Sequence, residues 1–307
     1  MHKPVLLEPT ISHLVTDTKG IYVDLTLGGG GHLRALLEKL DPEAQVIAFD
    51  KDEETMLKTQ QEFDTSTVKF INTDFKFLIE VLNREKIDKV SGIMADLGVS
   101  SFQLDEAERG FSFHEEALLD MRMNRNQPIS AWHVVNEYSE AEIIHLLFIY
   151  GEEKYARQIA RKIVNQRVNK PIDTTLQLVE IIKAAVPASY RREKHPARKT
   201  FQAIRIAVND ELQAIELMLP QAVEVLKPNG RLCIITFHSL EDRIVKKFIQ
   251  ENSRDCVCPP GYPICICGHT AKLRPVTRKP IVPSSEECEG NPRARSAKLR
   301  VASRVQF

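Results

Sequence analysis

Short apolar runs alternate with segments of helical spacing in the first third of the chain. Between residues 20 and 98, β-branched and other apolar side chains gather in runs that predict buried strands. Leucines at helical spacing follow, as from Leu33 to Leu40. The predicted strands cover 21–27, 44–49, 68–72 and 90–97. This alternation predicts an α/β fold with a parallel, doubly wound sheet, in which ligands bind at the carboxyl ends of the strands.

The pattern changes after about residue 105, where helical spacing continues without a convincing strand. Ser139 and Glu142 form a Ser-x-x-Glu pattern that is typical of a helix N-terminus, and Pro187 ends a later helix. The predicted helices cover 139–150, 152–166 and 174–186. We therefore predict a helical domain at 106–194, inserted into an α/β domain that comprises 1–105 and 195–307.

Strand and helix patterns return after this insert. Helical spacing covers 201–226 as one long segment, with a kink expected at Pro220. A Pro-Asn-Gly turn at 228–230 then leads into a strand at 230–237, and Ser239 is the expected cap of the next helix. Apolar and basic residues alternate at 297–305, which predicts a final strand at the edge of the sheet.

Four consecutive glycines, Gly28 to Gly31, connect the first predicted strand to the first helix. Such a turn lets a ligand lie against bare backbone, and the N–H groups of the new helix favour an anionic group there. The alternative is a flexible surface loop. The third glycine of a dinucleotide fingerprint is missing, and His32 follows where a P-loop would continue with Gly-Lys-Ser/Thr.

Acidic residues follow the second and third predicted strands. Asp50 comes about twenty residues after the glycines, where a carboxylate can accept hydrogen bonds from both ribose hydroxyls. Asp74 and Phe75 follow the third strand, and one or the other is expected near an adenine ring. A ribose with one small anionic group suits S-adenosylmethionine, whose methionine carboxylate would meet the helix N-terminus.

Asp96 follows the fourth strand and is the candidate for catalysis. At the carboxyl edge of the sheet it would lie beside the sulfonium and accept hydrogen bonds from an attacking amine. In methyl transfer the cofactor supplies the reactivity, and the protein mainly supplies alignment. The alternative is that Asp96, in Asp-Leu-Gly-Val-Ser-Ser, only caps a turn.

Composition excludes some classes of protein and leaves others open. The 307 residues are 43% hydrophobic and 27% charged, as in ordinary globular proteins. There is no apolar run of membrane-spanning length and no secretion signal at the start, so we expect a soluble, cytoplasmic protein without a membrane partner. The 42 basic and 42 acidic residues cancel, so only local clusters of charge could indicate a nucleic-acid partner.

Several long motifs resemble one known family. They are Asp96-Leu-Gly-Val-Ser-Ser-Phe-Gln-Leu-Asp, Arg109-Gly-Phe-Ser-Phe, Leu119-Asp-Met-Arg-Met, His195-Pro-Ala-Arg-Lys-Thr-Phe-Gln-Ala-Ile-Arg and Phe237-His-Ser-Leu-Glu-Asp-Arg. In this order they resemble the bacterial 16S rRNA cytosine-N4 methyltransferases of the RsmH/MraW family, over nearly the whole chain. The resemblance implies a Rossmann-like class I S-adenosylmethionine-dependent methyltransferase fold with an inserted helical substrate-recognition domain. It also implies methylation of a decoding-region cytidine on N4, with 16S rRNA or the small ribosomal subunit as partner and no DNA.

The resemblance also implies a set of cofactor-binding positions. Spacing alone already selects most of them, whereas His32 and Gln103 come from the resemblance. The expected cofactor-binding residues are Gly30, Gly31, His32, Asp50, Asp74, Phe75, Asp96 and Gln103. The Asp/Asn-Pro-Pro-aromatic motif of many amino-methyltransferases is missing after strand four, so another aromatic must stack the base. Phe102, Phe111 and Phe113 are candidates, and a role in the core is the alternative for each.

Basic residues gather at both junctions of the predicted insert, where they could clamp an RNA backbone. The alternative for each is a solvated charged face. The candidate RNA-binding residues are Arg122, Arg125, Arg191, Arg192, Lys194, Arg198 and Lys199. His238 is a second catalytic candidate because it follows a strand and could face the target base, and a local hydrogen bond is its alternative.

Five soft ligands for metal lie within one short, proline-rich segment: Cys256, Cys258, Cys265, Cys267 and His269. In a chain without a secretion signal they favour a metal over disulfides, and tetrahedral zinc would use four of them. The alternative is a set of reduced thiols. Two other functions stay open for the whole chain, namely a non-catalytic RNA-binding assembly factor and, less favoured, a nicotinamide dehydrogenase.

Overall fold

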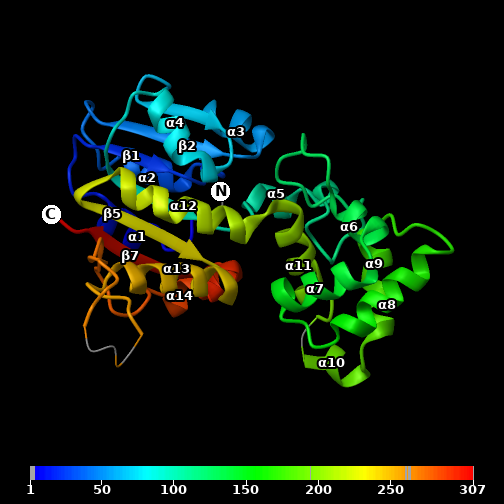
Figure 1. Ribbon diagram of the computed structural model, residues 1–307. Coiled ribbons are helices and arrows are strands. Elements are labelled where there is room, and N and C mark those ends of the chain that lie inside the picture. Colours follow the sequence, from blue (N-terminus) through cyan, green and yellow to red (C-terminus); the bar gives the residue numbers. More distant parts are fainter. Residues whose placement is uncertain (1–3, 194, 260, 262–263, 307) are drawn as a thin grey trace. The chain divides into compact units, whose positions relative to one another are not determined.

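The computed structural model describes residues 4–193, 195–259, 261 and 264–306 (Figure 1). The chain divides into two compact units, which we call the sheet unit (Met1–Gly98 with Leu212–Phe307) and the helical unit (Val99–Glu211). None of the described helices combines the length and the apolar character needed to span a bilayer.

A mixed sheet of seven strands, counted over the described residues, forms the centre of the sheet unit. The strands are β1 (Ile21–Asp24), β2 (Gln45–Asp50), β3 (Val68–Asn72), β4 (Val90–Asp96), β5 (Leu226–Thr236), β6 (Leu273–Pro275) and β7 (Lys298–Arg304). Their order is β3-β2-β1-β4-β5-β7-β6, with β1 to β5 parallel and β7 antiparallel to both of its neighbours. The order reverses between β1 and β4, which is where ligands bind in doubly wound sheets. The predicted Rossmann-like α/β fold is confirmed.

Helices cover both faces of this sheet, because the strands are apolar on both sides. They are α1 (Leu7–Leu14), α2 (Gly31–Leu37), α3 (Glu53–Gln60), the 3-10 turn η1 (Phe75–Phe77), α4 (Leu78–Arg84), α12 (Glu211–Val225), α13 (Ser239–Asn252), α14 (Ser285–Gly290) and η3 (Pro292–Ser296). One face packs α4, α12 and α13 over β1, β4 and β5, and the other packs α1 and α2. The two cores hold the strand ends rigidly.

The structure corrects three expectations about elements of the sheet unit. β7 is an inner strand, because the short β6, which the sequence pattern missed, pairs with its outer side. The turn at Pro228 lies within β5, whose register against β4 shifts between Val90 and Gly92. The predicted helix 201–226 is two helices, since Asp210 adopts a left-handed conformation with φ 51° and ends the first.

The helical unit is built around its own apolar core. Its helices are α5 (Ser101–Asp105), η2 (Ala107–Arg109), α6 (Ala131–Glu137), α7 (Glu140–Gly151), α8 (Ala156–Arg167), α9 (Thr175–Ala185), α10 (Ala188–Glu193) and α11 (Arg198–Asn209). The capping box of Ser139 and Glu142 at α7 forms as predicted. The unit begins at Val99 and ends at Glu211, whereas sequence patterns place the insert at 106–194, because α11 packs into this core.

Candidate functional site

The glycine turn joins β1 to α2 in the sheet unit. Gly28 and Gly30 have positive φ values of 48° and 70°, which side chains rarely adopt. A Cβ on Gly30 would lie 2.6 Å from the Phe63 ring, and one on Gly31 would lie 2.2 Å from Pro4 Cγ. Backbone conformation and close packing therefore require glycine at these positions, whatever ligand approaches the turn.

Asp50 ends β2 and is held in place by backbone. Its Oδ2 accepts a hydrogen bond from the Gly28 N–H at 2.9 Å, and its Oδ1 accepts one from the Asp52 N–H at 2.9 Å. Burial raises the pKa of the Asp50 carboxyl to about 6, although these two N–H groups lower it. Each carboxylate oxygen keeps a further lone pair, so the fixed carboxylate can still accept hydrogen bonds from two hydroxyl groups.

Two more carboxyl groups lie at the ends of the adjacent strands β1 and β4. Asp24 is fully buried, and Asp96 is partly buried. In the described part of the structure, Asp24 Oδ2 and Asp96 Oδ1 are buried without a hydrogen-bond partner. Burial, together with the charge of Asp50, raises the pKa of Asp24 to about 7. Burial, together with the charges of Asp24 and Glu241, raises the pKa of Asp96 to about 8.

His32 lies close to Asp96 but carries no positive charge that could pair with its carboxylate. Its Nε2 lies 3.1 Å from the Val5 carbonyl oxygen, which makes Nε2 the protonated nitrogen of a neutral ring. Burial lowers the pKa of His32 to about 4, although the Val5 carbonyl raises it. Nδ1 then faces Asp96 Oδ2 at 3.7 Å as an uncharged group. The resemblance places His32 at the cofactor, and the structure places it beside Asp96.

His238 is the N-cap of α13, a role that the sequence pattern assigned to Ser239. Its Nδ1 accepts a hydrogen bond from the Glu241 N–H at 3.4 Å, and its Nε2 lies 3.1 Å from Glu241 Oε1. Glu241 Oε2 in turn accepts from the Phe237 N–H at 2.8 Å. His238 thus has a local hydrogen bond at Nδ1, as its alternative role requires, whereas its buried Nε2 makes no hydrogen bond in the described residues despite its closeness to Glu241 Oε1.

The carboxyl ends of β1 and β4 therefore bring two acids, Asp24 and Asp96, close together. In the described residues no lysine or arginine pairs with Asp24 or Asp96. A buried carboxylate without a counter-charge is costly, and this cost favours the protonated form of both groups. The donor set fits the sulfonium group and the ribose of S-adenosylmethionine. The sequence analysis did not select Asp24, although an acidic residue within an apolar strand is unusual and already indicates a candidate site residue.

Comparison with known proteins shows the family of the chain. A family model described as the MraW methylase family matches residues 1–305. The chain belongs to the MraW methylase family. It is 50% identical over 305 residues to the ribosomal RNA small subunit methyltransferase H of Clostridium botulinum (strain Kyoto / Type A2), covering 99% of each chain. It is also 50% identical over 308 residues to the protein of that name from Carboxydothermus hydrogenoformans, covering 100% of this chain and 98% of that one. An rRNA methylase structure from Streptococcus thermophilus aligns over 100% of this chain and 99% of its own at 12% identity, with a TM-score of 0.44, which is too distant to carry an argument.

The remaining cofactor candidates of this MraW family member lie in both units. Asp74 caps η1 by accepting from the Lys76 N–H at 3.1 Å, and its Oδ2 lies 3.7 Å from Lys51 Nζ. Phe75 is partly buried against the core below the sheet edge. Gln103 is buried in the helical unit, where its side chain closes a capping box with Ser100.

The basic candidates for RNA binding differ in their surroundings. Arg122 donates two hydrogen bonds to Asp120, at 2.7 and 3.1 Å, and one to the Gln127 carbonyl at 2.8 Å. Lys199 Nζ donates to the Glu152 carbonyl at 2.7 Å. The exposed side chains are those of Arg125, Arg191, Arg192 and Arg198, and Lys194 lies outside the described residues.

The aromatic candidates for base stacking also differ in their burial and contacts. Phe111 is buried in the core of the helical unit, which agrees with the alternative role. Phe113 stacks on the His195 ring with centroids 4.5 Å apart, and Phe102 is 38% exposed. Phe102 and Phe113 are therefore the better candidates.

The five candidate metal ligands lie between α13 and β6. The sulfur atoms of Cys256, Cys258, Cys265 and Cys267 all lie within 4.8 Å of one another. His269 Nε2 instead contacts the Glu251 carbonyl oxygen at 3.0 Å, so His269 anchors the segment and is not part of this sulfur group.

Proposed function

We propose that this chain transfers a methyl group from S-adenosylmethionine to the exocyclic N4 of a cytidine in the decoding region of 16S rRNA. The observation that carries the proposal is the pair of buried carboxyl oxygens, Asp24 Oδ2 and Asp96 Oδ1, that have no hydrogen-bond partner in the described residues at the switch point of the sheet. Family membership and relatives named as small subunit rRNA methyltransferases support the choice of reaction and substrate.

The residues at the sheet edge would hold the cofactor. Asp50 would accept the ribose hydroxyls, because backbone N–H groups already orient its carboxylate. Asp24 and Asp96 would face the positive charge, since they have no other counter-ion in the described residues. When bound, S-adenosylmethionine supplies an electrophilic methyl group.

Asp96 has the second task of activating the amine. The N4 amine of cytosine is a poor nucleophile because its lone pair is delocalised into the ring. A nearby cation lowers the pKa of Asp96 below its raised value of about 8, so Asp96 ionises when the site is filled. The carboxylate of Asp96, which is partly exposed, can then accept an amine N–H, favour a pyramidal nitrogen and take up the proton that the methylated amine loses.

The base must leave its stack to reach Asp96, as in other enzymes that modify a base. The helical unit would supply RNA contacts, and its exposed arginines Arg191 and Arg192 on α10 are the first candidates. Arg122 is a weaker candidate, because Asp120 already takes up its guanidinium.

The test is methyl transfer from radiolabelled S-adenosylmethionine to RNA from a strain that lacks the gene. Small subunits and free 16S rRNA are offered separately, and the labelled nucleoside is identified by mass spectrometry. We expect N4-methylated cytidine with the wild-type protein and about a thousandfold slower formation of it with Asp96→Asn. RNA binding without transfer would favour a non-catalytic assembly factor, and label on another atom would refute the proposed substrate.

A further inference from the structure

The segment from Ser253 to Lys272 has no apolar core of its own. It connects α13 to β6, and no helix or strand forms in its described residues. Its apolar side chains point to solvent, with Ile264 74% exposed and Ile266 75% exposed. Burial therefore cannot fix the conformation of this segment, and another interaction is needed to order it.

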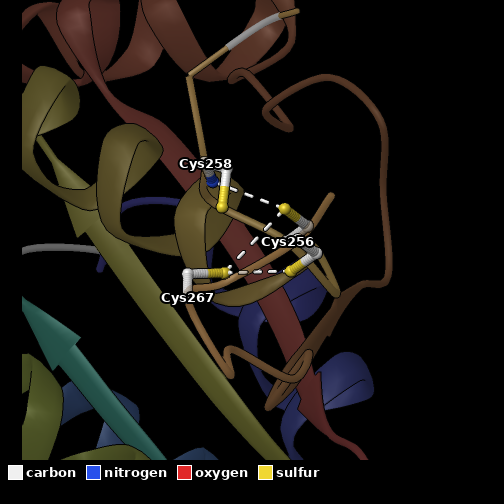
Figure 2. A group of neighbouring side chains, drawn as sticks. Cys256, Cys258 and Cys267 are labelled. Atoms are coloured by element: carbon white, nitrogen blue, oxygen red, sulfur yellow. Dashed lines mark hydrogen bonds between the residues drawn. The ribbon is translucent and has the colours of Figure 1, made fainter. Parts of the chain in front are cut away.

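The two ends of the segment are nevertheless joined at its base. The Lys272 N–H donates to the Asn252 carbonyl at 2.8 Å, and the Ala271 N–H donates to Asp255 Oδ1 at 3.2 Å. His269 adds a contact to the Glu251 carbonyl. These bonds bring the first Cys-x-Cys pair of the segment opposite the second, as Figure 2 shows for Cys256, Cys258 and Cys267.

The four sulfur atoms lie around a common centre. Cys265 Sγ and Cys267 Sγ are 3.5 Å apart, and Cys267 Sγ and Cys256 Sγ are 3.8 Å apart (Figure 2). In a tetrahedral site with Zn–S bonds of about 2.3 Å, neighbouring sulfurs are about 3.8 Å apart. The Cys258 N–H also points at Cys256 Sγ, at 3.4 Å, and such amide donors stabilise thiolate ligands.

We infer that Cys256, Cys258, Cys265 and Cys267 bind one Zn²⁺ ion as a closed structural site. Each S–H bond breaks as a Zn–S bond forms, and the proton passes to the solvent. Four protein ligands leave no open position, so the ion orders the segment and takes no part in methyl transfer. A disulfide would satisfy only two sulfurs, whereas this arrangement brings all four together.

Zinc content of protein purified without an affinity tag tests the inference directly. We expect about one zinc per chain in the wild type and almost none in Cys258→Ser or Cys265→Ser, each of which removes one ligand from one pair. Cys288→Ser is the matched control, because this partly exposed free cysteine lies outside the group and should keep the zinc. Thermal unfolding of each variant checks whether the sheet unit remains folded.

A second measurement on the wild-type chain keeps the test independent of the variants. Protein that has been reduced and freed of metal should bind one Co²⁺ and develop the absorption bands of tetrahedral thiolate coordination. Mass spectrometry of protein prepared without reductant should find all four cysteines of the segment as free thiols after zinc is removed. Disulfides in fresh protein, failure to bind Co²⁺, or zinc retained by Cys265→Ser would each overturn the inference.

Discussion

Two carboxyl groups of the helical unit, those of Asp120 and Glu211, have arginine partners, whereas Asp24 and Asp96 at the edge of the sheet have no lysine or arginine partner in the described residues. Glu211 accepts two hydrogen bonds from Arg205, each at 2.8 Å, and Asp120 accepts two from Arg122. Asp24 and Asp96 have an unpartnered oxygen each. Paired charges fix local structure, since their attraction offsets the loss of hydration. Unpaired acids cost stability, and their presence indicates a place for a cationic ligand.

The largest expected effect follows from removing the charge of Asp96. We expect Asp96→Asn to lower kcat by about 10³-fold, because an acceptor that acts mainly in the transition state is lost. RNA affinity should change little. Asp64→Asn is the control, since the side chain of this exposed turn residue accepts hydrogen bonds only from Ser66 in the described structure. Wild-type turnover by Asp96→Asn would end the assignment.

Stability should respond in opposite ways in the two units. Glu211→Gln removes a charged partner of Arg205 and should lower the free energy of unfolding by about 2–4 kcal/mol. Asp24→Asn should not destabilise the ligand-free protein at pH 8. In the folded protein the pKa of Asp24 is raised to about 7. The contribution of Asp24 to the free energy of unfolding therefore falls as pH rises from about 4 towards 7. Asparagine does not ionise, so Asp24→Asn avoids this loss of stability. Denaturant titrations at pH 5 and pH 8 measure both changes, and a large loss of stability in Asp24→Asn would contradict the comparison.

Asp50 has a smaller expected effect on cofactor affinity. Asp50→Ala removes charge-assisted hydrogen bonds to the ribose, at about 1.5–3 kcal/mol or roughly ten- to a hundredfold in Kd. Calorimetry with S-adenosylmethionine measures the change, and Asp64→Ala serves as the surface control. Unchanged affinity in a folded Asp50→Ala protein would place the ribose elsewhere.

The smallest effect concerns RNA. Replacing both Arg191 and Arg192 by alanine should reduce the slope of log K against log salt by about 1.5–2, if each contacts one phosphate. Arg157→Ala with Lys162→Ala, two exposed residues of α8, is the matched control in the same unit. An unaltered slope in the α10 variant would remove this helix from the RNA interface.

The sequence predicts the main strands well, because buried parallel strands are almost continuous apolar runs. β3 (Val68–Asn72) has the predicted bounds, and Asp50 and Asp96 end their strands as expected. β6 was missed because it has only three residues, one of them proline, and a single buried side chain. The break at Asp210 was missed because apolar spacing continues across it.

The site was harder to predict, because its properties depend on which strands are neighbours. Asp24 looks like part of an apolar strand, and only the pairing of β1 with β4 brings it close enough to raise the pKa of Asp96. Arg122 looks like an available cation in the sequence. Only the local fold shows that Asp120, two residues earlier, takes up its guanidinium.

The most direct test of the acid site compares the pH dependence of binding for S-adenosylmethionine and S-adenosylhomocysteine. The first carries the sulfonium charge and the second lacks it. Binding a cation favours ionised carboxyl groups, whose pKa values are about 7 for Asp24 and about 8 for Asp96. The affinity for S-adenosylmethionine should therefore rise from pH 6 to pH 9 with release of protons, while that for S-adenosylhomocysteine stays nearly level. Equal pH dependence for the two ligands, or weaker binding of S-adenosylmethionine at high pH, would contradict the account.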